Sequence, residues 1–253
     1  MCVIVIKQAG CDFPPAEVIA QCMKANPHGF AFAWNKDGQI HTYKTMSRQE
    51  ALDKYNELSR SFNPRESSLM FHARKATHGS HKVENCHCWT HGDIVFAHNG
   101  VLDIDARDDM TDSETYFRDL FCPVYDALGL NFAMRMSKAF LGSSSNKFAV
   151  MDKDGKFYLT RGKTGSFEKL TFDGYKGTFY FSNTSWQPRS TFSSALGFDP
   201  YRDPARAKGK AAPRSALPAA KAPVPVRAND GLTPAERMTL WEEQYRSLFG
   251  QTA

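Results

Sequence analysis

The second residue of the chain, Cys2, precedes the apolar run Val3–Ile6, which is rich in β-branched residues and predicts a buried strand. A small residue after an initiator methionine normally allows that methionine to be removed, which would make Cys2 the N-terminus. One residue would then carry a thiol and a free α-amine. The amine, with an ordinary pKa of about 7.7–8.0, could take the thiol proton near neutral pH. Position alone favours a simpler interpretation, in which Cys2 is a small apolar residue that starts a strand.

Histidine and cysteine gather in a second stretch that could do chemistry. Six of the eight histidines lie between positions 72 and 98, beside Cys86 and Cys88. Such a mixture of imidazole and thiol groups is compatible with zinc. The two thiols are separated by only one residue, however, whereas zinc knuckles usually place two to four between them, and no second cysteine pair follows. The sequence therefore predicts no metal site.

Three further patterns are weak when each is taken alone. Arg74 has the character of a solvated surface charge, and Asn99-Gly100 after a strand is typical of a hairpin turn. Acidic residues in Asp112–Glu114 suit the N-terminus of a helix, where they interact favourably with the helix dipole. Together with a cysteine at position 2, in this order and spacing, the three patterns indicate a catalytic site.

In this combination the chain resembles the class II glutamine amidotransferases, and its small free-standing members above all. These are N-terminal-nucleophile hydrolases whose glutaminase domain begins at a processed cysteine. The segments that carry the resemblance are Met1-Cys2, 26–34 (NPHGFAFAW), 72–79 (HARKATHG), 85–87 (NCH), 97–100 (AHNG) and 111–114 (TDSE).

The resemblance implies a role for each matching residue. Cys2 would attack the side-chain amide of glutamine, with its own α-amine as base. Asn99, through its side-chain amide, and Gly100, through its backbone N–H, would form the oxyanion hole. No cofactor is implied, and no histidine is needed for proton transfer, so the histidine-rich stretch would be mostly scaffold.

The resemblance also implies how the substrate is held. Arg74 would bind the α-carboxylate through its planar guanidinium group, and Asp112 would pair with the α-ammonium. Thr77 and His78 would line the carboxylate pocket. The chain departs from the family pattern at Val3, at Cys88 (where a proline usually follows Asn-x-His) and at Pro27–Phe30. These departures leave the amide substrate open between glutamine and a larger γ-glutamyl amide.

The elements that must position these residues follow from periodicity and turn signals. Strands are expected at 3–6, 30–34, 40–43, 67–74, 93–98, 147–151, 157–160, 167–172 and 178–181, and helices at 13–26, from Ser47 to about 58, at 112–121 and at 131–141. Ser47 and Glu50 form a capping-box pattern. Strands, then helices, then strands again predict an α+β fold with layered antiparallel sheets. The resemblance makes this the four-layer α/β/β/α sandwich of the N-terminal-nucleophile hydrolases.

Composition limits where the protein acts and what it binds. The formal net charge is +5, but six basic and no acidic residues lie in 204–228, so the remaining chain carries about −1. A nearly neutral body does not favour nucleic-acid binding. No apolar run approaches a membrane span and no signal peptide is evident, so a cytoplasmic protein with reduced thiols is expected.

The chain changes character near Asp199. We expect a glutaminase-type domain over residues 1–195 and a flexible linker rich in Ala, Pro and basic residues over 196–232. A C-terminal amphipathic helix is expected over 233–250, beginning with a capping box at Thr233–Glu236. About 60 residues of linker and helix are too few for a synthetase domain.

The expected reaction is hydrolysis of the glutamine amide to glutamate and ammonia through a cysteinyl thioester. The ammonia would pass to a separate synthetase, which the C-terminal helix could dock. Two alternatives stay open: a self-contained γ-glutamyl amide hydrolase, and a catalytically silent binding module that keeps the fold. Thiol-dependent turnover of glutamine, or of larger γ-glutamyl amides, discriminates between the three.

Overall fold

The computed structural model describes residues 2–76, 81–107 and 109–188. Its strands are β1 (Val3–Lys7), β2 (Phe30–Lys36), β3 (Gln39–Thr45), β4 (Leu69–Ala73), β5 (Trp89–His91), β6 (Ile94–Asn99), β7 (Lys147–Asp152), β8 (Phe157–Arg161), β9 (Glu168–Leu170) and β10 (Phe179–Phe181). Its helices are α1 (Ala16–Ala25), α2 (Arg48–Ser61), the 3₁₀ turn η1 (Val83–Asn85), α3 (Asp112–Thr115), the π-helical turn η2 (Tyr116–Phe121), α4 (Cys122–Leu128) and α5 (Leu130–Leu141).

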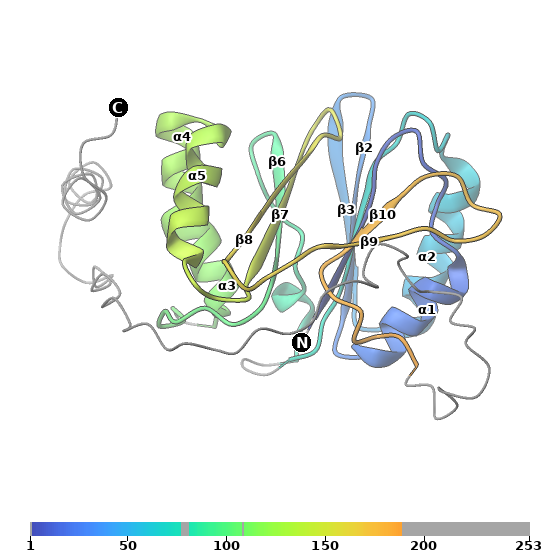
Figure 1. Ribbon diagram of the computed structural model, residues 1–253, viewed down its shortest axis with the longest axis horizontal. Helices are drawn as coiled ribbons and strands as arrows, with labels where there is room; N and C mark the ends of the chain where they lie inside the picture. Colours follow the sequence, from blue (N-terminus) through green and yellow to red (C-terminus); the bar gives the residue numbers. More distant parts are fainter. Residues whose placement is uncertain (1, 77–80, 108, 189–253) are drawn as a thin grey trace, which may run out of the picture. The chain divides into compact units, whose positions relative to one another are not determined.

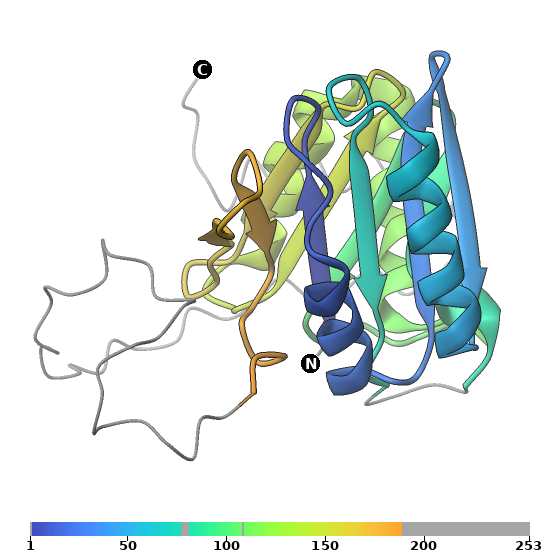
Figure 2. The same cartoon turned by 90° about the vertical axis from the view of Figure 1, so that its right-hand side faces the viewer.

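Two antiparallel sheets are stacked face to face, with helices on both outer faces (Figure 1). The larger sheet has the order β3-β2-β4-β1-β10-β9, and the smaller has the order β5-β6-β7-β8. Helices α1 and α2 lie against the outer face of the larger sheet, as the second view shows (Figure 2). Helices α3, α4 and α5 lie beside the smaller sheet. The predicted α+β class and the four-layer α/β/β/α order are confirmed.

Strand β1 is central to the larger sheet because it pairs with β4 on one side and β10 on the other. All five of its residues are buried, and they alternate between two cores as a period of two requires. Val3 and Val5 pack into the core beneath α1 and α2. Ile4 and Ile6 pack into the core between the sheets, which is rich in alanine and cysteine.

The smaller sheet is covered by an aromatic cluster. Phe96 of β6 stacks on Phe117 of η2, with ring centroids 5.0 Å apart, and Tyr116 stacks on Phe148 of β7 at 4.7 Å. Large buried rings of this kind remove much apolar surface from water. This packing holds the turn α3–η2 against the sheet, and with it the residues at the start of α3.

Most expected elements are present, with differences at their ends. The sequence prediction missed β5, which has three residues, and α4, which continues directly from η2. The capping box of α2 is half formed: Ser47 accepts from the Glu50 N–H at 3.3 Å, whereas the Glu50 carboxylate accepts from the Thr45 hydroxyl at 2.5 Å. The expected linker (196–232) and C-terminal helix (233–250), with the boundary at residue 195, lie outside the described residues.

Candidate active site

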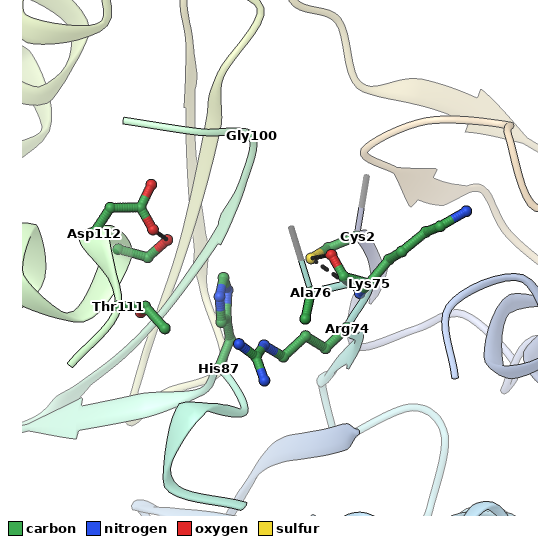
Figure 3. A pocket seen from close by; sticks show the side chains of 9 residues that line it. Cys2, Arg74, Lys75, Ala76, His87, Gly100, Thr111 and Asp112 are labelled. Carbon is green, nitrogen blue, oxygen red and sulfur yellow. Dashed lines mark hydrogen bonds between the residues drawn. The ribbon is translucent and has the colours of Figure 1, made fainter. Parts of the chain in front are cut away.

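One end of the sandwich brings together segments that are far apart in the sequence. Here β1 begins, β4 and β6 end, and α3 begins. They surround a small pocket that is open to solvent (Figure 3). The residues that line it are Cys2, Arg74, Lys75, Ala76, His87, Gly100, Thr111, Asp112 and Ser113.

Cys2 lies just before β1 and is held through its backbone and its thiol. The Asn183 side-chain amide donates to the Cys2 carbonyl at 2.7 Å. The Lys75 N–H points at the Cys2 sulfur, with an N–S distance of 3.4 Å. Burial raises the pKa of the Cys2 thiol, and the Lys75 contact opposes this in part. A thiol in this setting needs a base nearby to become a nucleophile.

Arg74 follows Ala73, the last residue of β4. Because Ala73 lies opposite Val3 of β1, the strand register places Arg74 beside Cys2. Its backbone is fixed on both sides: its N–H donates to the Gly29 carbonyl at 2.8 Å, and its carbonyl accepts from the His28 N–H at 2.9 Å. The side chain is only 3% exposed. Figure 3 shows it directed toward the middle of the pocket, whereas the Lys75 side chain points away.

Asp112 is the first residue of α3, and Thr111 is the N-cap, since the Thr111 hydroxyl accepts from the Glu114 N–H at 3.2 Å. One oxygen of Asp112 accepts from the Leu102 N–H at 2.7 Å, and the other lies 3.2 Å from the Ser113 hydroxyl oxygen. The carboxylate is thus oriented by its neighbours and lines the pocket (Figure 3).

Gly100 follows β6 in a conformation that favours glycine, with φ = +148°. A Cβ atom at this position would lie 1.6 Å from Asn146 Oδ1. Asn146 holds the next residue through both ends of its amide: it accepts from the Val101 N–H at 2.8 Å and donates to the Val101 carbonyl at 2.9 Å. The loop after β6 is therefore fixed by Asn146 and requires glycine at position 100.

Asn99 ends β6 and is buried rather than part of the pocket lining. Its Nδ2 lies 2.6 Å from the Ser182 hydroxyl oxygen. Ser182 directly follows β10 and in turn bonds Ile4, two residues beyond Cys2. Asn99 therefore contacts the segment that carries Cys2 through a serine, at the boundary between the two sheets.

Three buried histidines form a row between the sheets and behind the pocket. The His72 and His87 rings stack with centroids 3.9 Å apart, and the centroids of His87 and His98 are 6.3 Å apart. Burial lowers the pKa of each, to about 4 for His98. Since Val101 fixes the Asn146 amide, Asn146 Oδ1 must accept from His98 Nε2 at 3.1 Å, and His98 Nδ1 then accepts from the Ser113 hydroxyl at 2.7 Å. The row is neutral and, through His98, joins the Gly100 loop to the start of α3.

The structure brings four predicted site residues to one pocket, namely Cys2, Arg74, Gly100 and Asp112, and places Asn99 next to it. Thr77 and His78 lie outside the described residues. Sequence reasoning missed His87 and Thr111 in the lining, and Asn146, Ser182 and Asn183 behind it. Thr111 had a local signal, as a capping threonine before Glu114. His87 belongs to the segment 85–87 (NCH), which carries part of the resemblance. Asn146, Ser182 and Asn183 had no signal, because their contacts join distant segments.

Among the described residues of the histidine- and cysteine-rich stretch, His87 reaches the pocket wall. Cys86 and Cys88 are buried in the core between the sheets, and the Cys86 sulfur lies 3.8 Å from the Met46 sulfur. Over the ranges that the structure describes, no three Cys, His, Asp or Glu side chains converge as metal ligands.

The protein is a four-layer sandwich in which Cys2 directly precedes β1, a strand in the middle of the larger sheet. The family model of the class II glutamine amidotransferases matches residues 10–160. The chain therefore belongs to the class II glutamine amidotransferases. No curated protein sequence matches it.

Two solved structures are similar to this chain at low sequence identity. Glutamine phosphoribosylpyrophosphate amidotransferase from B. subtilis is 12% identical with a TM-score of 0.47, and the match covers 72% of this chain and 42% of that one. A glutamine aminotransferase class-II domain protein from Silicibacter pomeroyi is 15% identical with a TM-score of 0.42, with coverages of 72% and 88%. The chain thus spans less than half the length of the first of these. Among the described helices, none has the length and apolar character needed to cross a membrane.

Proposed function

We propose that the protein is a cytoplasmic glutaminase of the amidotransferase type, which hydrolyses the side-chain amide of glutamine through a thioester on Cys2. The observation that carries the proposal is the convergence of Cys2, Arg74, Gly100 and Asp112 on one small pocket. A nucleophile, a cation, an anion and a backbone donor in that space match the groups of a single amino-acid substrate.

The chemical steps need only groups of this chain and water. After removal of Met1, the Cys2 α-amine takes the thiol proton, and the thiolate attacks the carboxamide carbon. The Gly100 N–H and the Asn99 amide stabilise the oxygen that becomes negative. The protonated amine then gives its proton to the departing ammonia, and a thioester remains. Water, activated by the same amine, attacks the thioester to release glutamate and restore the thiol.

The substrate is held at its other end by charge. Arg74 would bind the α-carboxylate in bidentate fashion, and Asp112 would pair with the α-ammonium. The hydrogen bond from the Leu102 N–H fixes the Asp112 carboxylate before substrate arrives, which reduces the ordering cost of binding.

The test combines the mass of the intact protein with a glutaminase assay. The native protein should lack Met1 and release ammonia from glutamine, and Cys2→Ala should reduce turnover at least about a thousandfold, as loss of a nucleophile does. Cys11→Ala is the matched control, because Cys11 is also half-buried and free but does not line the pocket. Full activity in Cys2→Ala, or in protein that retains Met1, would refute the mechanism.

The destination of the ammonia is part of the proposal. We expect it to pass to a separate synthetase, docked by the segment 233–250. Stimulation of glutaminase activity by a co-purifying protein supports this, and faster turnover of larger γ-glutamyl amides than of glutamine contradicts it.

A further inference from the structure

Ser182 lies where the first and last strands of the larger sheet meet. Its N–H donates to the Ile4 carbonyl at 2.9 Å, and its hydroxyl oxygen accepts from the Ile4 N–H at 2.8 Å. Ser182 is 1% exposed. Its neighbour Asn183 donates to the Cys2 carbonyl at 2.7 Å. The two residues after β10 therefore hold the backbone that carries the nucleophile.

The Asn99 amide meets the same hydroxyl from the other sheet. Asn99 Nδ2 lies 2.6 Å from Ser182 Oγ, so two N–H donors, from Ile4 and Asn99, converge on one oxygen. The hydroxyl proton of Ser182 is used in neither bond. Within the described part of the chain, Asn99 Oδ1 is buried without a hydrogen-bond partner. A buried acceptor left unpaired costs about 1–3 kcal/mol.

A half-turn of the Asn99 amide about its terminal torsion gives both Asn99 Oδ1 and the Ser182 hydroxyl proton a hydrogen-bond partner. The two ends of an asparagine amide have nearly the same shape, so the exchange requires no change in packing. Ser182 then accepts from the Ile4 N–H and donates its own proton to Asn99 Oδ1. The Asn99 NH₂ group moves to the position that the unpaired oxygen holds, on the residue that precedes the pocket-lining Gly100, where it has no partner among the described residues.

We infer that Ser182 is a positioning residue for the proposed amide hydrolysis, because its hydroxyl fixes the Asn99 amide with the NH₂ end toward the substrate oxygen. This inference rests on the proposed function and deepens it. The orientation matters because an N–H stabilises the developing oxyanion, whereas an amide oxygen in its place would repel it. Ser182 lies beyond residues 10–160, the part matched by the family model.

A double-mutant cycle in the full-length mature protein tests the inference. Ser182→Ala should lower kcat at least about tenfold with KM within about twofold, since an oxyanion donor acts mainly in the transition state, and Asn99→Ala should lower kcat about 10²–10³-fold. In the double variant, Ser182→Ala should cause no further loss, because its effect passes through Asn99. Additive losses, or an unchanged kcat in Ser182→Ala, would overturn the inference.

Two controls separate positioning from general damage. Ser137 of α5 is another buried serine, hydrogen-bonded to Tyr116 and to the Ala133 carbonyl, so Ser137→Ala should lower the melting temperature without changing kcat. Alkylation of Cys2 by iodoacetamide proceeds by displacement at a tetrahedral carbon and forms no oxyanion. Its rate should be the same in wild type and Ser182→Ala, and a parallel loss of alkylation and turnover would overturn the inference.

A readout independent of activity distinguishes failure of this inference from failure of the proposed function. Neutron diffraction on the mature protein locates deuterium directly. The expected map has deuterium on Ser182 Oγ directed at Asn99 Oδ1, and an ND₂ group directed away from Ser182. An ND₂ group directed at Ser182 overturns the inference. A wild-type protein without glutamine turnover would overturn the proposed function, while the map would still decide the orientation.

Discussion

At the scale of single residues, Gly100 is the position least open to change. Gly100→Ala would combine φ = +148° with a Cβ placed 1.6 Å from Asn146 Oδ1. We expect the free energy of unfolding to fall by about 2–4 kcal/mol, because backbone strain and displacement of Asn146 add. Since Asn146 also holds Val101, kcat should fall with it. Chemical denaturation and the glutaminase assay measure the two effects.

Gly38→Ala is the matched control for that experiment. Gly38, in the β2–β3 turn, has φ = +70°, but a Cβ there would meet no atom within 4 Å. The free energy of unfolding of Gly38→Ala should fall by only about 1–2 kcal/mol, the cost of a side chain in the left-handed backbone conformation, and kcat should not change. If both variants lose the same stability, the close contact with Asn146 has no energetic weight.

Substitutions of Arg74 and Asp112 should weaken substrate binding more than they slow the chemical step. Arg74→Lys and Asp112→Asn should raise KM about 10- to 100-fold, the value of one charged hydrogen bond or pair, and change kcat less. The reason is that the groups they contact keep their charge through the reaction. Asp126→Asn, which removes a surface pair with His91, controls for loss of a carboxylate. Steady-state kinetics with glutamine would contradict the assignment if kcat fell and KM did not change.

At the scale of elements, the row of His72, His87 and His98 makes stability depend on pH. Burial lowers the folded-state pKa of all three below the ordinary 6.5. The unfolded chain therefore binds protons first as pH falls, so stability is full above about pH 7 and declines between 6.5 and 4. With its pKa at about 4, His98 alone should account for a loss of about 2 kcal/mol between pH 7.5 and 5.

Urea denaturation across that range measures the slope. His98→Gln should reduce the pH dependence, whatever it does to stability at pH 7.5, because one of the three titrating groups is gone. A wild-type protein equally stable at pH 7.5 and 5 would contradict burial of a neutral histidine row.

The same scale shows what sequence patterns can predict. Val3–Ile6 predicted the central strand because a β-branched apolar run suits a strand buried on both faces. Trp89–His91 was missed because three residues carry too little periodicity, and η2 because a π-helical turn shares the apolar spacing of an α-helix. In the site, Arg74 and Asp112 were identified through the segments that carry the family resemblance. Ser182 could not, because a lone serine becomes informative only when β10 is paired with β1.

At the scale of the whole molecule, the described core ends at Trp186. This side chain is 3% exposed and stacks on Phe181 of β10, with ring centroids 5.1 Å apart. We expect a chain shortened to residues 1–195 to keep its melting temperature within a few degrees and to retain basal glutaminase activity. Calorimetry and the ammonia assay test this. Unfolding of the shortened chain would show that later residues complete the core.

In contrast to the shortened chain, full-length Trp186→Ala should lose both stability and activity. Removing a buried tryptophan should cost about 3–5 kcal/mol of unfolding free energy. Because the Trp186 indole also donates to the Asn183 carbonyl at 3.0 Å, and Asn183 holds Cys2, activity should fall as well. Full activity in this variant would show that the Cys2 backbone is held without the Trp186 contact.

The pairing of β1 with β10 has a consequence for biosynthesis. Ile4 and Ser182 are separated by 178 positions, so the first strand lacks one of its two neighbours until nearly the entire domain has left the ribosome. At typical translation rates of about 5–20 residues per second, that interval lasts roughly 10–35 s. Under the proposed function, an aminopeptidase has this time to trim the nascent N-terminus before the sheet closes around it. Under the same proposal, trimming would precede assembly of the sheet, and Cys2 would become reactive only when β10 pairs with β1.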